Sequence, residues 1–309
     1  IVPVLVGVTD AVTDGVPGKT VPKMGILQAF ATDPDWTENP FWMLNVLQYK
    51  DEHKYNEYSR AMAEEVLPRT GARVVFSGYA RTVIGRKEYH HVAIVEYPSP
   101  QAFLQMAASP QMMEKNHLRL QGLAEQYLIP MRPGWFRIDR PAPPASKSIT
   151  SFNAETAWSI PNGMIGAAVT GARVGETSST RAQAEAFATD GRLAPPAGPL
   201  WHLNLLRFDG SAGRETYERY ARAMGRKDGV LAQYGARSTL STACYKSLIG
   251  DEDFDQSIIV EYPSRDHFMT MATSHAYMQA AHLRHQGLKE TYIISCLPEL
   301  TDKSSMRVA

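Results

Sequence analysis

The sequence predicts an α+β fold built from two copies of one βαββαβ unit with antiparallel sheets. Three observations predict it: sequence blocks that recur in order, a Pro-rich stretch between the copies, and strand-like segments that alternate with helical periodicity inside each copy. The length of 309 residues suits two domains.

The repeat is visible as six blocks of the first half that return in the same order in the second half. The matched blocks are 29–33 with 186–190, 42–45 with 201–204, 58–62 with 220–224, 71–73 with 235–237, 95–99 with 260–264, and 117–123 with 282–288. The offset grows in small steps from 157 to 165, and the steps fall between blocks, where loops tolerate insertion. Six ordered blocks do not arise by chance, so the chain is an internal duplication.

A Pro-rich stretch at 139–148 separates the copies. Three prolines in ten residues are incompatible with a helix interior or a central strand, which predicts a semi-rigid linker. The expected organisation is a first repeat at 1–138 with its core at about 41–131, a linker at 139–149, and a second repeat at 150–309 with its core at about 200–296.

Within the first copy, hydrophobic periodicity and turn residues predict the order of elements. The expected strands are 41–49, 72–84, 90–97 and 127–131, and the expected helices are 54–67, a helix capped by Ser99, and 110–123. In the first strand, alternation places Met43, Asn45 and Leu47 on one face. This order is the split βαβ, ferredoxin-like unit.

An extra segment of about 40 residues precedes each unit and contains a short predicted helix, at 22–30 in the first copy and 180–187 in the second. Covering an exposed sheet edge or a barrel mouth is the physical role that we expect for it, because an uncovered edge invites association.

The motifs inside each unit resemble a known family. The first strand 43–47 is followed by the pair Tyr55 and Tyr58, then by a strand that ends in the block 95–99, and by Ser109-Pro110 with Arg119 nine residues beyond the proline. This set is similar to the DUF1330 family and to the wider dimeric α/β-barrel superfamily, over about 41–130 and 200–295. The second copy departs at Ser274-His275 but keeps Arg284.

This resemblance implies two ferredoxin-like sheets that face one another and close a barrel around an apolar cavity. Two chains usually supply the two sheets, so a duplicated chain is expected to form the barrel by itself; pairing of each copy with a second chain, as a homodimer or larger homo-oligomer, is the alternative. The superfamily includes cofactor-independent monooxygenases, isomerases and haem enzymes, so fold alone does not choose the chemistry.

Polar residues in apolar surroundings are the candidates for substrate binding. Asn45 and Asn204 lie mid-strand, where a buried amide needs partners, either a ligand carbonyl or hydroxyl or the backbone at a strand end. His202, which replaces Met43, and the repeated Tyr58 and Tyr220 complete this group.

The helix near the end of each unit carries the candidates for catalysis. His117 and His282 each precede an arginine, Arg119 or Arg284, by two residues, so one of each pair can face inward while the other faces solvent. An inward histidine suits a general base, an oxyanion donor or a haem ligand; the alternative is a surface histidine. The arginines suit a carboxylate clamp or a helix cap.

Two acidic residues and one histidine pair complete the candidates. Glu96 and Glu261 end a strand beside apolar residues, which suits either a base with a raised pKa or a salt-bridge partner. His90-His91 does not predict a metal site, because adjacent strand residues face opposite sides and the second copy has Asp255-Gln256 there.

Charge, cysteine content and the lack of long apolar runs limit the classes of partner and compartment that we expect. Lys+Arg and Asp+Glu both number 32, so no net field attracts nucleic acid or an anionic membrane. Cys244 and Cys296 form no disulfide or zinc pattern, and we expect buried reduced thiols in a cytoplasmic protein. We find no signal peptide or apolar run of membrane-spanning length, although the sequence begins at Ile1 rather than Met.

These observations favour a small-molecule enzyme that binds an apolar or aromatic, carbonyl-bearing compound in the barrel and performs acid–base chemistry without an organic cofactor. Isomerisation, lyase chemistry and cofactor-free oxygenation all fit. The first alternative is a haem enzyme with His117 or His282 as axial ligand. The second is a non-catalytic binding or interaction protein.

Overall fold

The computed structural model describes residues 18–37, 39–133, 135–136, 142–151, 171–194 and 198–301. The strands are β1 (Phe41–Tyr49), β2 (Arg73–Ile84), β3 (His91–Tyr97), β4 (Leu123–Met131), β5 (Trp135–Phe136), β6 (Leu200–Phe208), β7 (Arg237–Ala243), β8 (Gln256–Tyr262) and β9 (Leu288–Thr301). The helices are α2 (Met24–Thr32), α3 (Glu52–Ala61), α4 (Pro100–Ala107), α5 (Pro110–Gly122), α7 (Arg181–Thr189), α8 (Gly210–Gly225), α9 (Val230–Gln233), α10 (Arg265–Ala272) and α11 (His275–Gly287).

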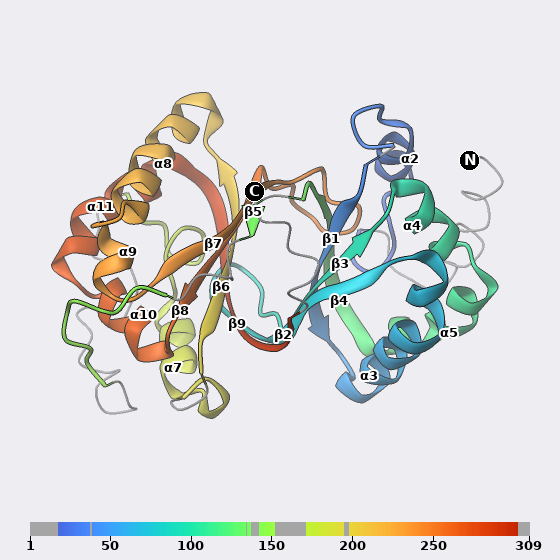
Figure 1. Ribbon diagram of the computed structural model, residues 1–309, viewed down its shortest axis with the longest axis horizontal. Helices are drawn as coiled ribbons and strands as arrows, with labels where there is room; N and C mark the ends of the chain where they lie inside the picture. The colour runs from blue at the N-terminus through green and yellow to red at the C-terminus, as the bar shows by residue number, and fades with distance from the viewer. Residues whose placement is uncertain are drawn as a thin grey trace.

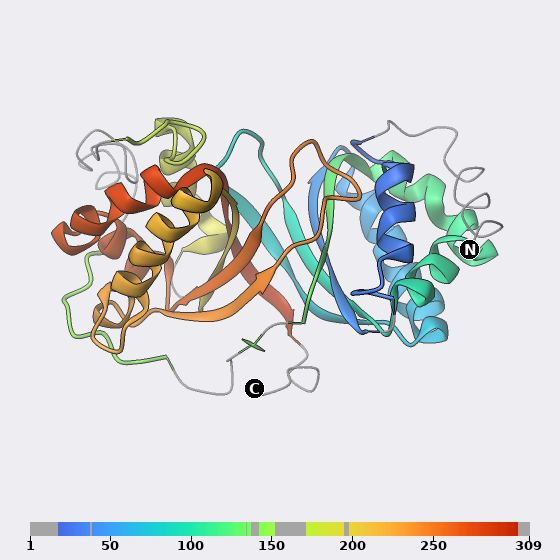
Figure 2. The same cartoon turned by 90° about the horizontal axis from the view of Figure 1, so that it is seen from above.

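The two repeats form two half-sheets of the same strand order, β4-β1-β3-β2 and β9-β6-β8-β7, and neighbouring strands pair antiparallel. The half-sheets face one another, and the helices of each repeat lie on the outer sides (Figures 1 and 2). The α+β duplication that the sequence predicts is therefore confirmed.

The half-sheets join into one barrel through two related seams. At one seam, β2 pairs with β9 along its length, from Phe76↔Thr301 to Ile84↔Ile293. At the other, β4 meets the segment that follows β7, through bridges at Leu128↔Ile249 and Met131↔Cys244. The last strand of each repeat thus pairs with the other repeat, at β2 in one seam and just after β7 in the other, and one chain closes the barrel that the family resemblance implies.

The interior of the barrel is filled by side chains from both repeats. Trp42, Leu44 and Val46 of β1 and their counterparts Trp201, Leu203 and Leu205 of β6 all belong to this buried cluster. The rings of Phe76 and Trp201 stack across the interior at 5.1 Å. The expectation of a ligand cavity inside the barrel is therefore wrong: alternation sends one face of each strand into a packed core and leaves the other face for the helices.

The helices cover the outer face of each half-sheet at close range. Gly122 at the end of α5 allows this approach, since a Cβ there would lie 2.6 Å from the backbone nitrogen of Tyr55 on α3. A Cβ at Gly287 of α11 would likewise lie 2.8 Å from the backbone nitrogen of Tyr217 on α8. The glycine of the repeated 117–123 block therefore sets the helix packing in both repeats.

Two predicted elements differ in extent. The helix expected at 54–67 begins at Glu52, where the Asp51 side chain accepts a hydrogen bond from Lys54 N, and ends in a π-helical turn (Met62–Val66) and a 3-10 turn (Leu67–Thr70). Pro68 lacks the N–H that an α-helix would need. β4 begins four residues early, at Leu123, because its first residues pair with the end of β1.

The extra segments lie across the seams. Lys23 N, just before α2, donates to Leu248 O at 2.8 Å, on the second repeat. Gln183 of α7 donates to Gly85 O at 2.7 Å, on the first repeat. Each segment therefore joins its own repeat to the other, which sharpens the predicted edge-covering role.

Two further predictions concern the linker and the cysteines. Residues 139–141 of the expected linker lie outside the described residues, whereas Ser146 N, further along, donates to Gln233 O at 3.0 Å. Cys244 and Cys296 are free thiols, and burial raises the pKa of both. Of the helices that the structure describes, none combines the length and the apolar character that a membrane crossing requires.

Candidate functional site

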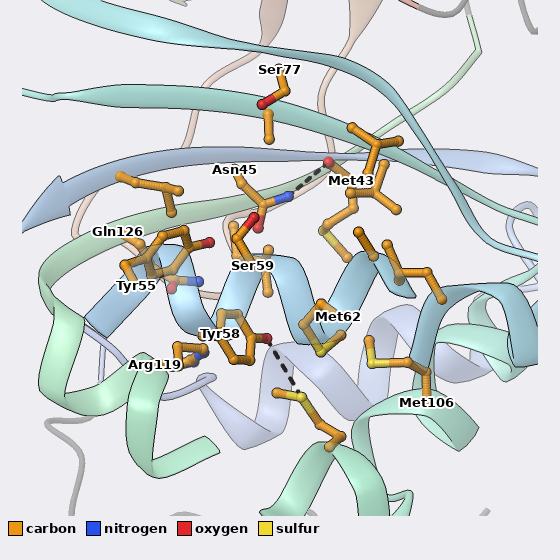
Figure 3. A pocket seen from close by; sticks show the side chains of 18 of the residues that line it. Met43, Asn45, Tyr55, Tyr58, Ser59, Met62, Ser77, Met106, Arg119 and Gln126 are labelled. Carbon is orange, nitrogen blue, oxygen red and sulfur yellow. Dashed lines mark hydrogen bonds between the residues drawn. The ribbon is translucent and has the colours of Figure 1, made fainter. Parts of the chain in front are cut away.

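A cavity of about 350 Å³ lies in the first repeat, between the outer face of its half-sheet and the helices (Figure 3). The sheet contributes Met43, Asn45 and Leu47 from β1, which is the face that alternation predicts. The helices contribute residues that include Tyr58 of α3 and Arg119 of α5. The volume falls within the range of small-molecule sites.

The lining is polar on one side and rich in methionine on the other, as Figure 3 shows. The polar side chains on that side include Asn45, Tyr55, Tyr58, Ser59, Arg119 and Gln126, and the methionines include Met43, Met62, Met106 and Met112. Methionine side chains adapt to irregular apolar and aromatic shapes. The cavity is therefore suited to an apolar body with one polar end.

Asn45 and Tyr58, both predicted to bind substrate, line this cavity. Asn45 Nδ2 donates to Met43 O at 3.0 Å, and the Tyr58 hydroxyl donates to Met112 Sδ at 3.5 Å. Burial raises the pKa of Tyr58, against an opposing effect of Arg119, so the phenol stays protonated. Asn45 retains a second N–H and its carbonyl oxygen for a ligand, whereas the single O–H of Tyr58 can donate to a ligand oxygen only in place of its weak bond to sulfur.

The cavity also contains a Ser–His pair that the sequence did not identify as a site. Ser77 Oγ on β2 and His91 Nε2 on β3 share a hydrogen bond of 2.8 Å, and both residues line the cavity. Burial lowers the pKa of His91 to about 4, so the imidazole is neutral near pH 7. Strand alternation could have identified His91, because it places His91 on the same face of β3 as Ala93, which pairs with Asn45 of β1.

His90 points elsewhere, as adjacent strand residues must. Its Nδ1 accepts a hydrogen bond from Tyr49 N at 3.0 Å. In the part of the chain that the structure describes, no three His, Cys, Asp or Glu residues are grouped as a metal site would require.

The two predicted arginines, Arg119 and Arg284, each donate to a backbone carbonyl of the segment before their repeat. Both terminal nitrogens of Arg119, Nη1 and Nη2, donate to Thr20 O, at 2.7 and 2.5 Å. Arg284 Nη1 donates to Thr177 O, its counterpart before the second repeat. Each arginine thus anchors the segment that precedes its repeat, but Arg119 lines the cavity and Arg284 is buried in the protein.

The histidines beside these arginines do not reach a cavity. His117 is exposed on the outer face of α5, and its Nδ1 lies 2.8 Å from Glu114 O. His282 is half-buried and lines neither repeat's cavity. The inward member of each pair is the arginine, so of the two alternatives for these histidines the structure matches the one outside the cavities. These two residues do not fit a haem held by a helix-borne histidine.

Glu96 and Glu261 lie on the other face of the sheet from the cavity. Glu96 accepts hydrogen bonds from Arg73 Nη2 at 2.8 Å and from Trp42 Nε1 at 2.9 Å. Glu261 accepts from Arg237 Nη2 at 2.8 Å. The structure places both as salt-bridge partners and brings neither to the cavity that holds Asn45.

The corresponding space in the second repeat is much smaller, about 100 Å³. Asn204, His202 and Tyr220, which the sequence suggested as substrate-binding residues, line it. His202 is 1% exposed, neither of its ring nitrogens has a partner among the described residues, and burial lowers its pKa to about 3.

Three substitutions narrow this second cavity. Ile258 replaces Ala93 at the position that pairs with the strand asparagine. Tyr277 replaces Met112 in the first turn of the last helix, and His202 replaces Met43. The Ser–His pair becomes Ser241 and Gln256, whose Nε2 donates to the Ser241 hydroxyl at 2.7 Å outside the cavity lining.

Comparison with known proteins places the fold in a wider context. The family model described as "Domain of unknown function (DUF1330)" matches residues 39–130 and 211–296, more than half of the chain. No curated protein matches the chain.

Solved structures are similar at low identity. A protein of unknown function from Rhodopseudomonas palustris is 27% identical over 38% of this chain and 98% of its own, with a TM-score of 0.35. An anthrone oxidase-like protein is 10% identical over 85% of this chain and 92% of its own, with a TM-score of 0.46. Chlorite dismutase from Candidatus Nitrospira defluvii is 10% identical over 87% and 94%, with a TM-score of 0.38.

Proposed function

This chain belongs to the DUF1330 family, whose description assigns no activity, and from its geometry we propose that the first repeat is a small-molecule enzyme site. Its ligand is an apolar or aromatic, carbonyl-bearing compound that lies between the half-sheet and the helices. The reaction is acid–base chemistry on that ligand without an organic cofactor. The observation that carries the proposal is the Ser77–His91 hydrogen bond inside the 350 Å³ cavity.

The two sides of the cavity support the ligand class. The methionine side offers an adaptable apolar surface, and the polar side offers neutral donors that suit a carbonyl oxygen. Tyr55 and Tyr58 stay protonated because burial raises the pKa of both phenols. A phenol that remains protonated is a hydrogen-bond donor to a carbonyl oxygen and to the enolate that forms from it.

His91 is the group that we assign to proton transfer. Its low pKa keeps the imidazole neutral and able to accept a proton. A buried imidazolium is unfavourable alone, but proton transfer from the ligand creates an anion beside it, and their attraction in a low-dielectric site offsets that cost. Isomerisation, elimination and cofactor-free oxygenation can all begin with such a proton removal.

The test uses an enolisable bicyclic ketone, 2-tetralone, with the full chain in deuterated buffer. Binding is measured by calorimetry, and deuterium incorporation beside the carbonyl is followed by NMR. We expect the wild type to bind the ketone and to accelerate exchange. His91→Gln, which installs the residue of the second repeat, should bind within about 3-fold and lose the acceleration. Arg60→Gln, on the exposed face of α3, is the matched control and should change neither.

Three outcomes would contradict the proposal. Binding without accelerated exchange would favour the non-catalytic binding protein. Exchange that survives His91→Gln would assign the proton transfer to another group. A Soret band in the purified protein, or after addition of haemin, would contradict the cofactor-free chemistry.

A further inference from the structure

We infer that the natural ligand of the first-repeat cavity is an anion and that Arg119 recognises its negative charge. This inference rests on the proposed function, because it takes the same cavity as the ligand site. It adds the substrate class: an aromatic or apolar compound with a carboxylate or an equally acidic group at one end.

Arg119 is held rigidly at the polar side of the cavity. Its two terminal nitrogens share one acceptor, Thr20 O, at 2.7 and 2.5 Å, and that carbonyl belongs to the segment before the repeat. A single neutral carbonyl fixes the position of the guanidinium but leaves its charge without compensation. The guanidinium has five N–H donors, so it retains capacity for a ligand.

No carboxylate compensates that charge in the part of the chain that the structure describes. Arg119 is half-buried and takes part in none of the ion pairs there, and its charge opposes the rise in pKa of the Tyr55 and Tyr58 phenols. A positive charge in a largely apolar cavity is costly unless an anion accompanies it. The cavity is therefore complementary to a negative ligand group.

One carboxylate, Glu299 at the end of β9, does line the cavity. It raises the pKa of Tyr49, which lies outside the lining. Its side chain is exposed, and no ion pair joins it to Arg119 in the part of the chain that the structure describes. Solvent screens an exposed charge, so Glu299 is a weak partner for the arginine.

The second repeat separates the structural role of this arginine from its role in recognition. Arg284 makes the same tether to Thr177 O, yet its Nη2 is buried without a partner among the described residues and it does not line the second repeat's cavity. The tether is thus common to both repeats, whereas of these two cavities the first reaches its arginine and the second does not. An anion can approach Arg119 from the first cavity.

The geometry also orients the ligand. The acidic group lies at Arg119, with Tyr55 and Tyr58 as neighbouring donors, and the apolar body extends toward Met43, Met62 and Met106 (Figure 3). A compound with its charge in the middle of the ring system, or with charges at both ends, is a poor fit to this arrangement.

The experiment compares two probes of the same shape, 2-naphthoate and 2-naphthamide, by calorimetry on the full chain. We expect the wild type to bind the carboxylate at least about 10-fold more tightly than the amide, since charge-assisted hydrogen bonds are about twice as strong as neutral ones. Arg119→Gln should weaken carboxylate binding at least about 10-fold and amide binding by no more than about 3-fold. Arg60→Gln removes an exposed charge from the same repeat and should leave both affinities unchanged.

Each remaining outcome has a distinct meaning. Equal affinity of the wild type for both probes overturns the anion inference and leaves the proposed function standing. Equal weakening of both probes in Arg119→Gln does the same, because it assigns a merely structural role to the tether; Arg119→Lys, which keeps the charge, should then fail to rescue carboxylate selectivity. If neither probe binds, both the inference and the proposed ligand class are overturned.

Discussion

The two repeats share a scaffold and differ in the space that it encloses. Both keep the strand asparagine, the helix tyrosine and the tethered arginine, yet the cavity measures about 350 Å³ in the first repeat and about 100 Å³ in the second. The two asparagines make the same hydrogen bond: Asn45 Nδ2 donates to Met43 O at 3.0 Å, and Asn204 Nδ2 donates to His202 O at 2.9 Å. Retained polar motifs therefore do not by themselves mark a working site.

The difference lies in a few side chains that point into the gap between sheet and helices. Ala93 and Met112 leave room in the first repeat, and Ile258 and Tyr277 occupy it in the second. A duplicated barrel can thus keep one repeat as a scaffold while the other holds a ligand. The following predictions test that division, from the largest expected effect to the smallest.

Filling the first cavity should remove binding. Ala93→Ile copies the second repeat, where Ile258 pairs with the strand asparagine in the same register, so the strand accommodates the side chain. We expect affinity for 2-naphthoate to fall about 5- to 150-fold, since overpacking costs about 1–3 kcal/mol. Calorimetry measures the loss, and the melting temperature verifies the fold.

The reciprocal change is its control. Ile258→Ala lies in the second repeat and should leave 2-naphthoate affinity unchanged. If Ala93→Ile binds as the wild type does, or if Ile258→Ala abolishes binding, the ligand does not lie in the first repeat.

His202 should make stability depend on pH. Burial lowers its pKa to about 3, whereas an unfolded histidine titrates near 6.5. Below pH 6.5 the unfolded state therefore binds a proton that the folded state does not, and the free energy of unfolding falls until about pH 3. The loss between pH 7.5 and pH 5 should be about 2 kcal/mol.

His202→Met, which installs the first-repeat residue, should remove that part of the slope in urea denaturation. His91 adds a similar dependence, since its pKa is lowered to about 4, so the informative quantity is the difference between wild type and variant. His53→Gln, at an exposed histidine, is the control. If the difference in the free energy of unfolding between wild type and His202→Met stays constant across this pH range, His202 is protonated or solvated in the folded protein.

The seams should differ in strength as well. Asp190 accepts hydrogen bonds from Tyr79 and Arg81 across one seam; burial alone would raise its pKa, but these partners lower it. Asp190→Asn should destabilise the protein by about 1–3 kcal/mol in denaturant unfolding. Asp33→Asn, at the related position that hydrogen-bonds Tyr245, should cost less, because Asp33 forms no ion pair with an arginine among the described residues. Equal losses would contradict this account of the seams.

Much of the fold could be predicted from the sequence. The repeated blocks, Ser99 as a helix cap, Pro110 as a helix start and the alternation of the first strand all act locally, and the structure has them as expected. Helix periodicity also separated His117 from Arg119. It could not decide which faced inward, because that depends on the half-sheet against which α5 packs.

The site was harder to predict, since it depends on which face of the sheet encloses free volume. Both faces of β1 are apolar, so alternation alone did not distinguish the packed barrel interior from the cavity. Ser77 and His91 come from different strands, and only their register brings them within 2.8 Å. Sequence proximity drew attention to His90-His91 as a pair, whereas the useful partner of His91 lay on β2.

The central claim is that one ligand binds between sheet and helices of the first repeat, and methionine methyl NMR tests it most directly. Met43, Met62, Met106 and Met112 line that cavity, Met131 lies in the barrel interior, and Met224 and Met271 line the second cavity. On titration of ¹³C-methyl-methionine protein with 2-naphthoate, we expect the first group to shift together while the other three stay unchanged. A shift of Met131 would place the ligand inside the barrel, and a shift of Met224 and Met271 would place it in the second repeat; either result would contradict the account.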